Sequence, residues 1–139
     1  MKRNLIVSFS LVALSVTLIF LMNTDKKEVS INGRTFKVEV VSADKDRRRG
    51  LGGRSQICDD CGMLFLFQEP GKYSFWMKGM KFDLDIIWIS EGKIVHMAKN
   101  FSKDSKELIM PEVEADKVLE IRAGLSDEHG FQIGDSVQF

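Results

Sequence analysis

Residues 29–40 read Val-Ser-Ile-Asn-Gly-Arg-Thr-Phe-Lys-Val-Glu-Val. Apolar and polar side chains alternate on both sides of Asn32-Gly33, and this dipeptide is the strongest two-residue signal for a β-hairpin. The stretch therefore predicts two antiparallel strands joined by a tight turn. It also indicates that the domain containing it is built from β-strands.

The sequence after this hairpin continues mainly as short strands. Residues 42–51 lose the alternation, offer Ser42 or Asp44 as a helix cap and reach Gly50, so they predict a short helix. Further strands are predicted at residues 63–67, 73–78, 84–89, 94–98, 118–123 and 135–139, with a turn at 90–93 and one helical turn within 124–134. We therefore expect a mainly β fold, either an antiparallel sandwich or a partly closed barrel, with one or two short helices.

The N-terminus predicts insertion into a membrane. Lys2 and Arg3 precede an uninterrupted apolar run over residues 5–22, which as a helix spans roughly 27 Å and just matches the hydrocarbon core of a bilayer. Bulky residues end this run where a cleavage site needs small ones, so an uncleaved signal anchor is favoured over a cleaved signal peptide. Both alternatives place the rest of the chain outside the cytoplasm, either tethered to the cell membrane or secreted or periplasmic. The expected organisation is an anchor or signal at 1–22, a tether at 23–28 and a single β-rich domain at 29–139.

Length and charge exclude several classes of protein. The 139 residues leave room for one compact domain, and 20 Lys and Arg balance 20 Asp and Glu. A general nucleic-acid binder carries an excess of positive charge. We therefore expect no nucleic-acid partner.

Cys58 and Cys61 are the only cysteines of the chain. In an oxidising compartment they can form a local disulfide. Two acidic residues lie between them, and negative charge disfavours the thiolate that a catalytic dithiol needs. A structural disulfide or inert thiols are therefore favoured over metal ligation and redox catalysis. The two histidines, His96 and His129, show no ligand-like spacing, so no metal site and no cofactor is predicted.

A candidate binding site comes from strand geometry. Trp76 and Lys78 alternate with apolar neighbours in the predicted strand 73–78, so they share one of its faces. An aromatic ring beside a cation suits a sugar ring or a carboxylated ligand.

Buried charge adds further candidates to this site. Asp85 interrupts an apolar strand face, and a charge in such a place must be paired, so we predict that Arg54 or Lys78 contacts it. One interpretation is a polar ligand pocket at the edge of the sheet, and its candidate residues are Arg49, Arg54, Trp76, Lys78, Asp85 and Glu120. The other interpretation is a structural ion network with Trp76 packed in the core.

Six short motifs follow one another between Phe36 and Val137. They are Arg49-Gly-Leu-Gly-Gly-Arg54, Gly62-Met-Leu-Phe65, Phe75-Trp-Met-Lys78, Leu84-Asp-Ile-Ile87, Val118-Leu-Glu120 with Ala123-Gly124, and Gly134-Asp135. In this order they resemble the family called domain of unknown function 192. The resemblance implies a compact, β-rich, sandwich-like domain that is commonly exported and has no established activity.

The best functional hypothesis is a non-catalytic accessory or binding module, tethered to the membrane through residues 5–22, for a glycan, peptide or carboxylate ligand of the cell envelope. One alternative is a small extracytoplasmic enzyme, using either thiol redox chemistry at Cys58 and Cys61 or hydrolysis by Asp85 and Glu120. Another is a structural envelope protein whose surface serves only protein contacts. An enzyme is the less favoured class.

Overall fold

The computed structural model describes residues 27–139. Its elements, in chain order, are β1 (Lys27–Ile31), β2 (Arg34–Val41), α2 (Asp44–Arg49), β3 (Cys61–Gly71), β4 (Leu84–Ser90), β5 (Lys93–Phe101), β6 (Ala115–Arg122), α3 (Leu125–Glu128) and β7 (Val137–Gln138). The predicted anchor lies outside the described residues, and the last two residues of the predicted tether belong to β1. Among the described residues, no helix is long and apolar enough to cross a membrane.

Two predicted hairpins are confirmed. β1 pairs with β2 in antiparallel register from Lys27 to Ile31, and the turn residues Asn32 and Gly33 both have positive φ, +50° and +78°. This is the backbone that a two-residue turn needs to match the strand twist. The second hairpin joins β4 to β5 through the predicted turn.

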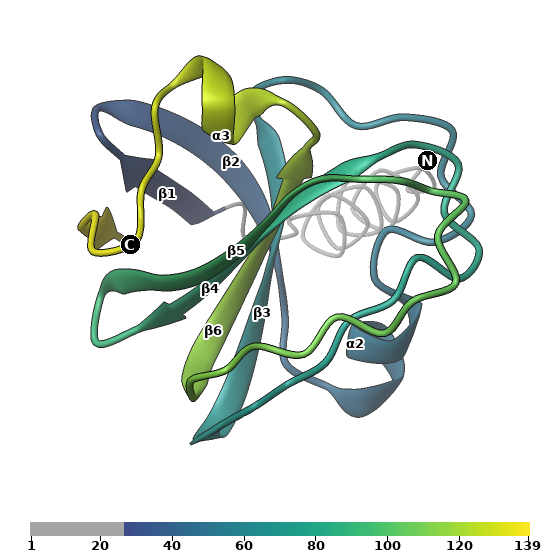
Figure 1. Cartoon of the computed structure of the whole chain (residues 1–139), viewed down its shortest axis with the longest axis horizontal. Coiled ribbons are helices and arrows are strands. Elements are labelled where there is room, and N and C mark those ends of the chain that lie inside the picture. Colours follow the sequence, from purple (N-terminus) through teal and green to yellow (C-terminus); the bar gives the residue numbers. More distant parts are fainter. Residues whose placement is uncertain (1–26) are drawn as a thin grey trace, which may run out of the picture.

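The strands form one sheet with the order β5-β4-β6-β3-β2-β1-β7. One pairing differs from the antiparallel expectation, because β2 and β3 run parallel. Parallel neighbours need a crossover connection, and residues 42–60 provide it, with α2 inside it (Figure 1). The sequence of each strand carries no signal for this non-local pairing.

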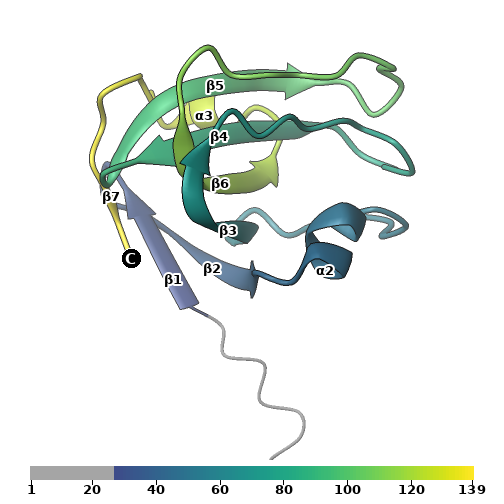
Figure 2. The ribbon, with the colours of Figure 1, turned by 90° about the horizontal axis from the view of Figure 1, so that it is seen from below.

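The sheet curls into a half-barrel. Figure 2 shows β4, β5 and β6 on one side and β1 and β2 on the other, with β3 between them. Lys93 at the start of β5 forms a bridge with Ser136, and the Ile94 N–H donates to the Asp135 carbonyl at 3.0 Å. These bonds bring the two edges of the sheet together at one end. Of the two predicted architectures, the partly closed barrel describes the structure, and the sandwich of two sheets is wrong.

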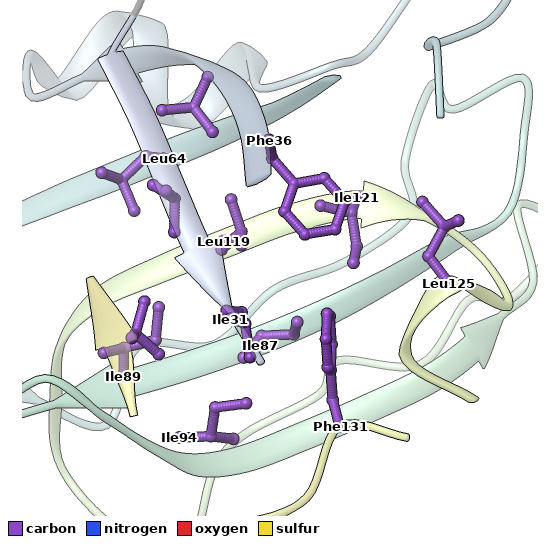
Figure 3. Packing of buried hydrophobic residues seen from close by; sticks show 13 residues of the cluster. Ile31, Phe36, Leu64, Ile87, Ile89, Ile94, Leu119, Ile121, Leu125 and Phe131 are labelled. Atoms are coloured by element: carbon purple, nitrogen blue, oxygen red, sulfur yellow. The ribbon is translucent and has the colours of Figure 1, made fainter. Parts of the chain in front are cut away.

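The inner face of the curl is filled by an apolar cluster to which every strand contributes (Figure 3). Phe36 and Phe131 meet edge to face with ring centroids 6.2 Å apart. The buried members are Val29, Ile31, Phe36, Val38, Leu64, Ile87, Ile89, Ile94, Leu119, Ile121, Leu125, Phe131 and Val137. Burying this set supplies the main driving force for the curl.

A second apolar cluster covers the outer face of the sheet. It is built on Met63, Phe65, Ile86, Trp88 and Val118, which alternate along their strands with the inner residues. Trp88 is fully buried and donates its Nε1–H to the Tyr73 carbonyl at 2.8 Å. The sheet is therefore buried on both faces, and irregular segments form its outer cover.

The outer cover includes residues 73–78, which sequence analysis assigned to a strand. Only Phe75 pairs there, through one bridge to Ile109. The alternation in this segment is real, since Met77 is buried while Trp76 and Lys78 are exposed. It arises because an extended segment covers the sheet, so the strand assignment is wrong, although Trp76 and Lys78 are on the same, exposed side of this segment.

Candidate functional site

A cavity of about 530 Å³ opens in the outer cover. Its walls come from the end of α2, from β3 and β6, and from the two segments that the Phe75–Ile109 bridge joins. The lining residues are Asp44, Arg47, Arg48, Arg49, Gly50, Leu51, Phe65, Phe67, Tyr73, Ser74, Phe75, Trp76, Lys78, Met80, Leu108 and Glu120. This volume lies in the range typical of small-molecule sites.

Glu120 is the buried acid of this cavity. It lies in β6 opposite Ile86 of β4 and Met63 of β3, and only 5% of its surface is exposed. Its Oε2 atom is buried and has no hydrogen-bond partner among residues 27–139. Burial raises the pKa of Glu120 from its ordinary value of 4.5 to about 8, because desolvation disfavours the charged form. At neutral pH the carboxyl is therefore mainly protonated, and it can both donate and accept a hydrogen bond.

Gly50 keeps this carboxyl open to the cavity. It follows the last residue of α2, its φ is +50°, and its N–H donates to the Asp46 carbonyl at 2.9 Å. A Cβ at this position would lie 3.4 Å from Phe65 Cζ and 3.8 Å from Glu120 Oε2. Glycine therefore ends the helix and also leaves free space beside the acid.

Aromatic rings form the walls. Phe67 and Tyr73 are stacked, with centroids 3.6 Å apart, and Phe65 meets Phe75 edge to face at 5.0 Å. The Tyr73 hydroxyl donates to the Glu69 carbonyl at 2.6 Å, so this hydroxyl is already engaged. The walls therefore offer rings to a ligand but few free polar atoms.

Cations lie around the mouth. Arg48, Arg49 and Lys78 are exposed, and the Lys78 Nζ lies 5.2 Å from the centroid of the Trp76 ring. Arg47 is half-buried instead. Its guanidinium forms an ion pair with Asp44 and donates to the Leu66 carbonyl at 2.8 Å. Arg49 lies 3.9 Å from Asp46, but Arg48 and Lys78 form no ion pair among residues 27–139, so the mouth carries positive charge.

Four of the six predicted site residues line this cavity, namely Arg49, Trp76, Lys78 and Glu120. Arg54 does not, because it forms a two-pronged ion pair with Glu39 at 2.5 and 2.7 Å. Asp85 does not either, because it lies one register position away from Glu120 and on the opposite face of the sheet.

The predicted contact of Arg54 or Lys78 with Asp85 is wrong. Asp85 is fully buried, and its partners are backbone N–H groups. Asn100 and Ser126 donate at 2.7 and 2.8 Å, and Gly124 donates at 3.2 Å. Backbone donors satisfy a buried carboxylate as well as a cation does. Because Asp85 and Glu120 occupy opposite faces, they cannot act together as a pair of carboxylates on one substrate.

Sequence analysis missed the aromatic walls and the role of Gly50. A signal for the walls was present, because residues 63–67 are continuously apolar and such a run is buried on both faces. Alternate members of it, Phe65 and Phe67, therefore had to lie against a second layer. Nothing in the sequence placed Tyr73 and Leu108 in that layer.

Cys58 and Cys61 form a disulfide, with Cα atoms 5.1 Å apart, which is one of the two alternatives, a disulfide or inert thiols, that the sequence favoured. The two acids between them make ion pairs, Asp59 with Arg122 at 2.5 Å and Asp60 with Arg34. Neither cysteine lines the cavity. Within residues 27–139 no group of three or more His, Cys, Asp or Glu side chains could hold a metal ion.

Similar proteins share this fold. A protein of unknown function from Novosphingobium aromaticivorans is 27% identical, with a TM-score of 0.77 over 81% of this chain and 84% of that chain. A protein from Sinorhizobium meliloti, whose description suggests a transcription regulator, is 32% identical, with a TM-score of 0.76 over 80% of this chain and 91% of that chain. A comparison with functionally curated proteins finds no match.

The family assignment agrees with the motif series found in the sequence. Residues 27–139 match the model of the family DUF192, which is described as an uncharacterised ACR. The match includes the described residues of every strand and of both helices. The chain therefore belongs to the DUF192 family, whose function is unknown.

Proposed function

We propose that this domain is an extracytoplasmic binding module that takes a small anionic ligand with an apolar body into the cavity of the outer cover. The proposal includes a tether to the membrane through residues 5–22, which the basic residues before the apolar run support. In this role the protein is an accessory module for an envelope component and performs no catalysis.

The observation that carries the proposal is the Glu120 carboxyl. A buried polar atom without a partner costs free energy, and a bond from a ligand can remove this cost. Among residues 27–139 the other buried side-chain atoms without a partner belong to Arg34, Asp116, Ser126 and His129, and of the five residues only Glu120 lines the cavity. A ligand atom that bonds to the Glu120 Oε2 removes this cost, and the site therefore gains affinity from a group that the fold leaves unsatisfied.

The walls and the mouth specify the rest of the ligand. The rings of Phe65, Phe67 and Phe75 favour a flat or apolar body. The cations Arg48 and Lys78 have no carboxylate partner among the ion pairs of residues 27–139, so they favour an anionic group at the mouth. A large glycan with many hydroxyl groups fits these walls poorly, because its hydroxyls would face carbon atoms.

Calorimetry on the full-length protein in detergent micelles tests the proposal. The probe is 3-phenylpropionate, and its uncharged amide is the matched control ligand. We expect measurable binding of the acid and at least about tenfold weaker binding of the amide, because the amide loses its attraction to the cationic mouth. Equal binding, or no binding of either, would contradict the proposal.

Two charge-reversal variants on helix α2 test whether the cations at the cavity mouth attract the ligand's carboxylate. Arg48 lines the cavity whereas Lys45, three residues earlier on the same helix, is exposed and does not. We expect Arg48→Glu to weaken the binding of 3-phenylpropionate about tenfold, and Lys45→Glu to leave it nearly unchanged. Similar losses in both variants would show that only the overall charge matters.

Topology is tested separately on intact cells. The full-length chain should fractionate with the membrane, and protease added outside the cytoplasmic membrane should cleave the domain. Recovery of the chain as a cytosolic protein would overturn the location without affecting the binding proposal.

A further inference from the structure

The lining of the cavity divides into three zones that differ in chemistry and burial. Glu120 is almost completely buried, the rings of Phe65, Phe67 and Phe75 are partly or fully buried, and Arg48 and Lys78 are exposed. A buried acid and buried or half-buried rings thus line the inner part of the cavity, and two exposed cations lie at its mouth. A complementary ligand carries a hydrogen-bonding group and an apolar body for the inner part and an anionic group for the mouth.

The interior zone calls for a single hydroxyl group. Glu120 Oε2 has no partner among the described residues, and a neutral carboxyl both donates and accepts, as a hydroxyl does. A simple hydrocarbon chain would leave this atom unsatisfied, which is costly in a buried site. A sugar would satisfy it but would place its other hydroxyls against the aromatic walls. One hydroxyl at the far end of an apolar body matches the site.

The middle zone calls for a ring. Phe67 and Tyr73 stack on each other, and Phe75 meets both Phe65 and Trp88 in edge-to-face arrangements, with centroids 5.0 and 5.7 Å apart. Rings in such arrangements accept another ring, face on or edge on. The half-exposed Trp76 indole and Leu108 side chain extend this apolar surface to the mouth.

From these three zones we infer that the ligand is a phenol that carries a carboxylate on a short side chain, with the phenol hydroxyl on Glu120 and the carboxylate beside Arg48 and Lys78. This inference rests on the proposed binding function and names its ligand class. Two sources supply this chemistry, a free phenolic acid and the C-terminal tyrosine of a peptide.

The test compares 3-(4-hydroxyphenyl)propionate with 3-phenylpropionate, which differ by the hydroxyl alone. With the full-length protein we expect the phenol to bind at least about tenfold more tightly, because a site built to bond a hydroxyl rejects the analogue that lacks it. Glu120→Leu should abolish this preference while it still binds 3-phenylpropionate, and Glu120→Gln should retain part of it. A thermal melt of each variant shows whether it is folded.

The outcomes separate the inference from the proposed function. Equal affinity for the two acids would overturn the phenol inference and leave the anion-binding function intact. Failure of both acids to bind would overturn both. A preference for the phenol that survives in the folded Glu120→Leu variant would also overturn the inference, because a group other than Glu120 would then bind the hydroxyl.

A second pair of probes distinguishes the two sources. A tetrapeptide that ends in tyrosine is compared with the same peptide carrying a C-terminal amide. Tighter binding of the free acid peptide than of 3-(4-hydroxyphenyl)propionate assigns the site to a C-terminal tyrosine. Weaker binding of the peptide than of the small acid assigns it to a free phenolic acid.

Discussion

Asp85 and Glu120 lie on neighbouring strands and are both buried, yet their surroundings are opposite in kind. Asp85, on the inner face, accepts three backbone N–H bonds, and these join the strand to β5 and to the segment after β6. Glu120, on the outer face, has an oxygen without a partner among the described residues and a cavity beside it. The carboxylate of Asp85 is thus satisfied by the fold itself, whereas the carboxyl of Glu120 remains able to form a hydrogen bond with a ligand.

This contrast shows why burial alone does not identify a site. Both acids interrupt apolar strands, and from sequence they are equally good candidates for a pocket. What separates them is the number of bonds that the protein itself supplies to each carboxyl.

The largest effect is expected at Asp85. Asp85→Ala leaves three buried or half-buried N–H groups without an acceptor, so we expect the free energy of unfolding to fall by about 4 kcal/mol. Urea denaturation of the full-length protein measures this loss. The control is Asp83→Ala, which removes an exposed carboxylate that accepts one N–H bond, from Lys103 at 2.7 Å, and should cost about 1 kcal/mol.

Double-mutant cycles then test the partners of Asp85. Asp85→Asn combined with Lys78→Ala, and separately with Arg54→Ala, should give additive changes in stability because neither cation contacts Asp85. A coupling energy above about 0.5 kcal/mol in either cycle would contradict the structure.

For each unit of pH, a smaller effect is expected from the pH dependence that Glu120 contributes. The folded protein keeps the Glu120 proton up to a pKa of about 8, whereas the ordinary value is 4.5. The folded state thus binds more protons between these values, so this contribution is fully present below pH 4.5 and is lost as pH rises through 8. The loss amounts to about 1.4 kcal/mol per pH unit.

Glu120→Gln removes the titrating group and should flatten this slope. The difference in stability between Glu120→Gln and the natural protein should grow in favour of the variant as pH rises from 5 to 8. Urea denaturation at each pH measures it. Glu128→Gln, which changes an exposed acid 3.9 Å from Arg122, should leave the slope unchanged. Parallel pH profiles for Glu120→Gln and the natural protein would show that Glu120 titrates normally.

A smaller effect is expected for the disulfide. The paired substitution Cys58→Ser with Cys61→Ser opens a loop of four residues, so we expect a loss of about 2 kcal/mol in the free energy of unfolding. Neither cysteine lines the cavity, and binding of 3-phenylpropionate should therefore persist in the folded variant. Reductase activity towards insulin that disappears in Cys58→Ser would instead support the redox alternative.

The smallest change in stability is expected at Gly50. Gly50→Ala places a Cβ at positive φ and 3.4 Å from Phe65, so it should cost about 1 kcal/mol and weaken ligand binding because the methyl group fills space beside Glu120. Gly33→Ala is the control, since its φ is also positive but nothing lies within 4 Å of the added atom. It should cost a similar amount and leave binding unchanged. Equal affinity in both variants would show that the ligand does not reach Gly50.

The parts of this structure that sequence predicted are those set by local patterns. The Asn32-Gly33 hairpin, the β4–β5 hairpin and the short helix near Gly50 each depend on residues close together in the chain. The parallel pairing of β2 with β3 could not be predicted, because it depends on how the crossover packs. The same holds for Asp85, whose partners are backbone groups that no residue type reveals.

The outer cover has a bearing on how related proteins diverge. Its two irregular segments, before β4 and after β5, meet through two backbone hydrogen bonds between Phe75 and Ile109, at 2.9 and 2.8 Å, and through the Lys103 N–H, which donates to the Asp83 carboxylate at 2.7 Å. The register of the strands does not depend on these segments. Insertions and substitutions there can therefore accumulate without changing how the strands of the sheet pair. The curled sheet can therefore remain constant through evolution while the cover changes what is recognised.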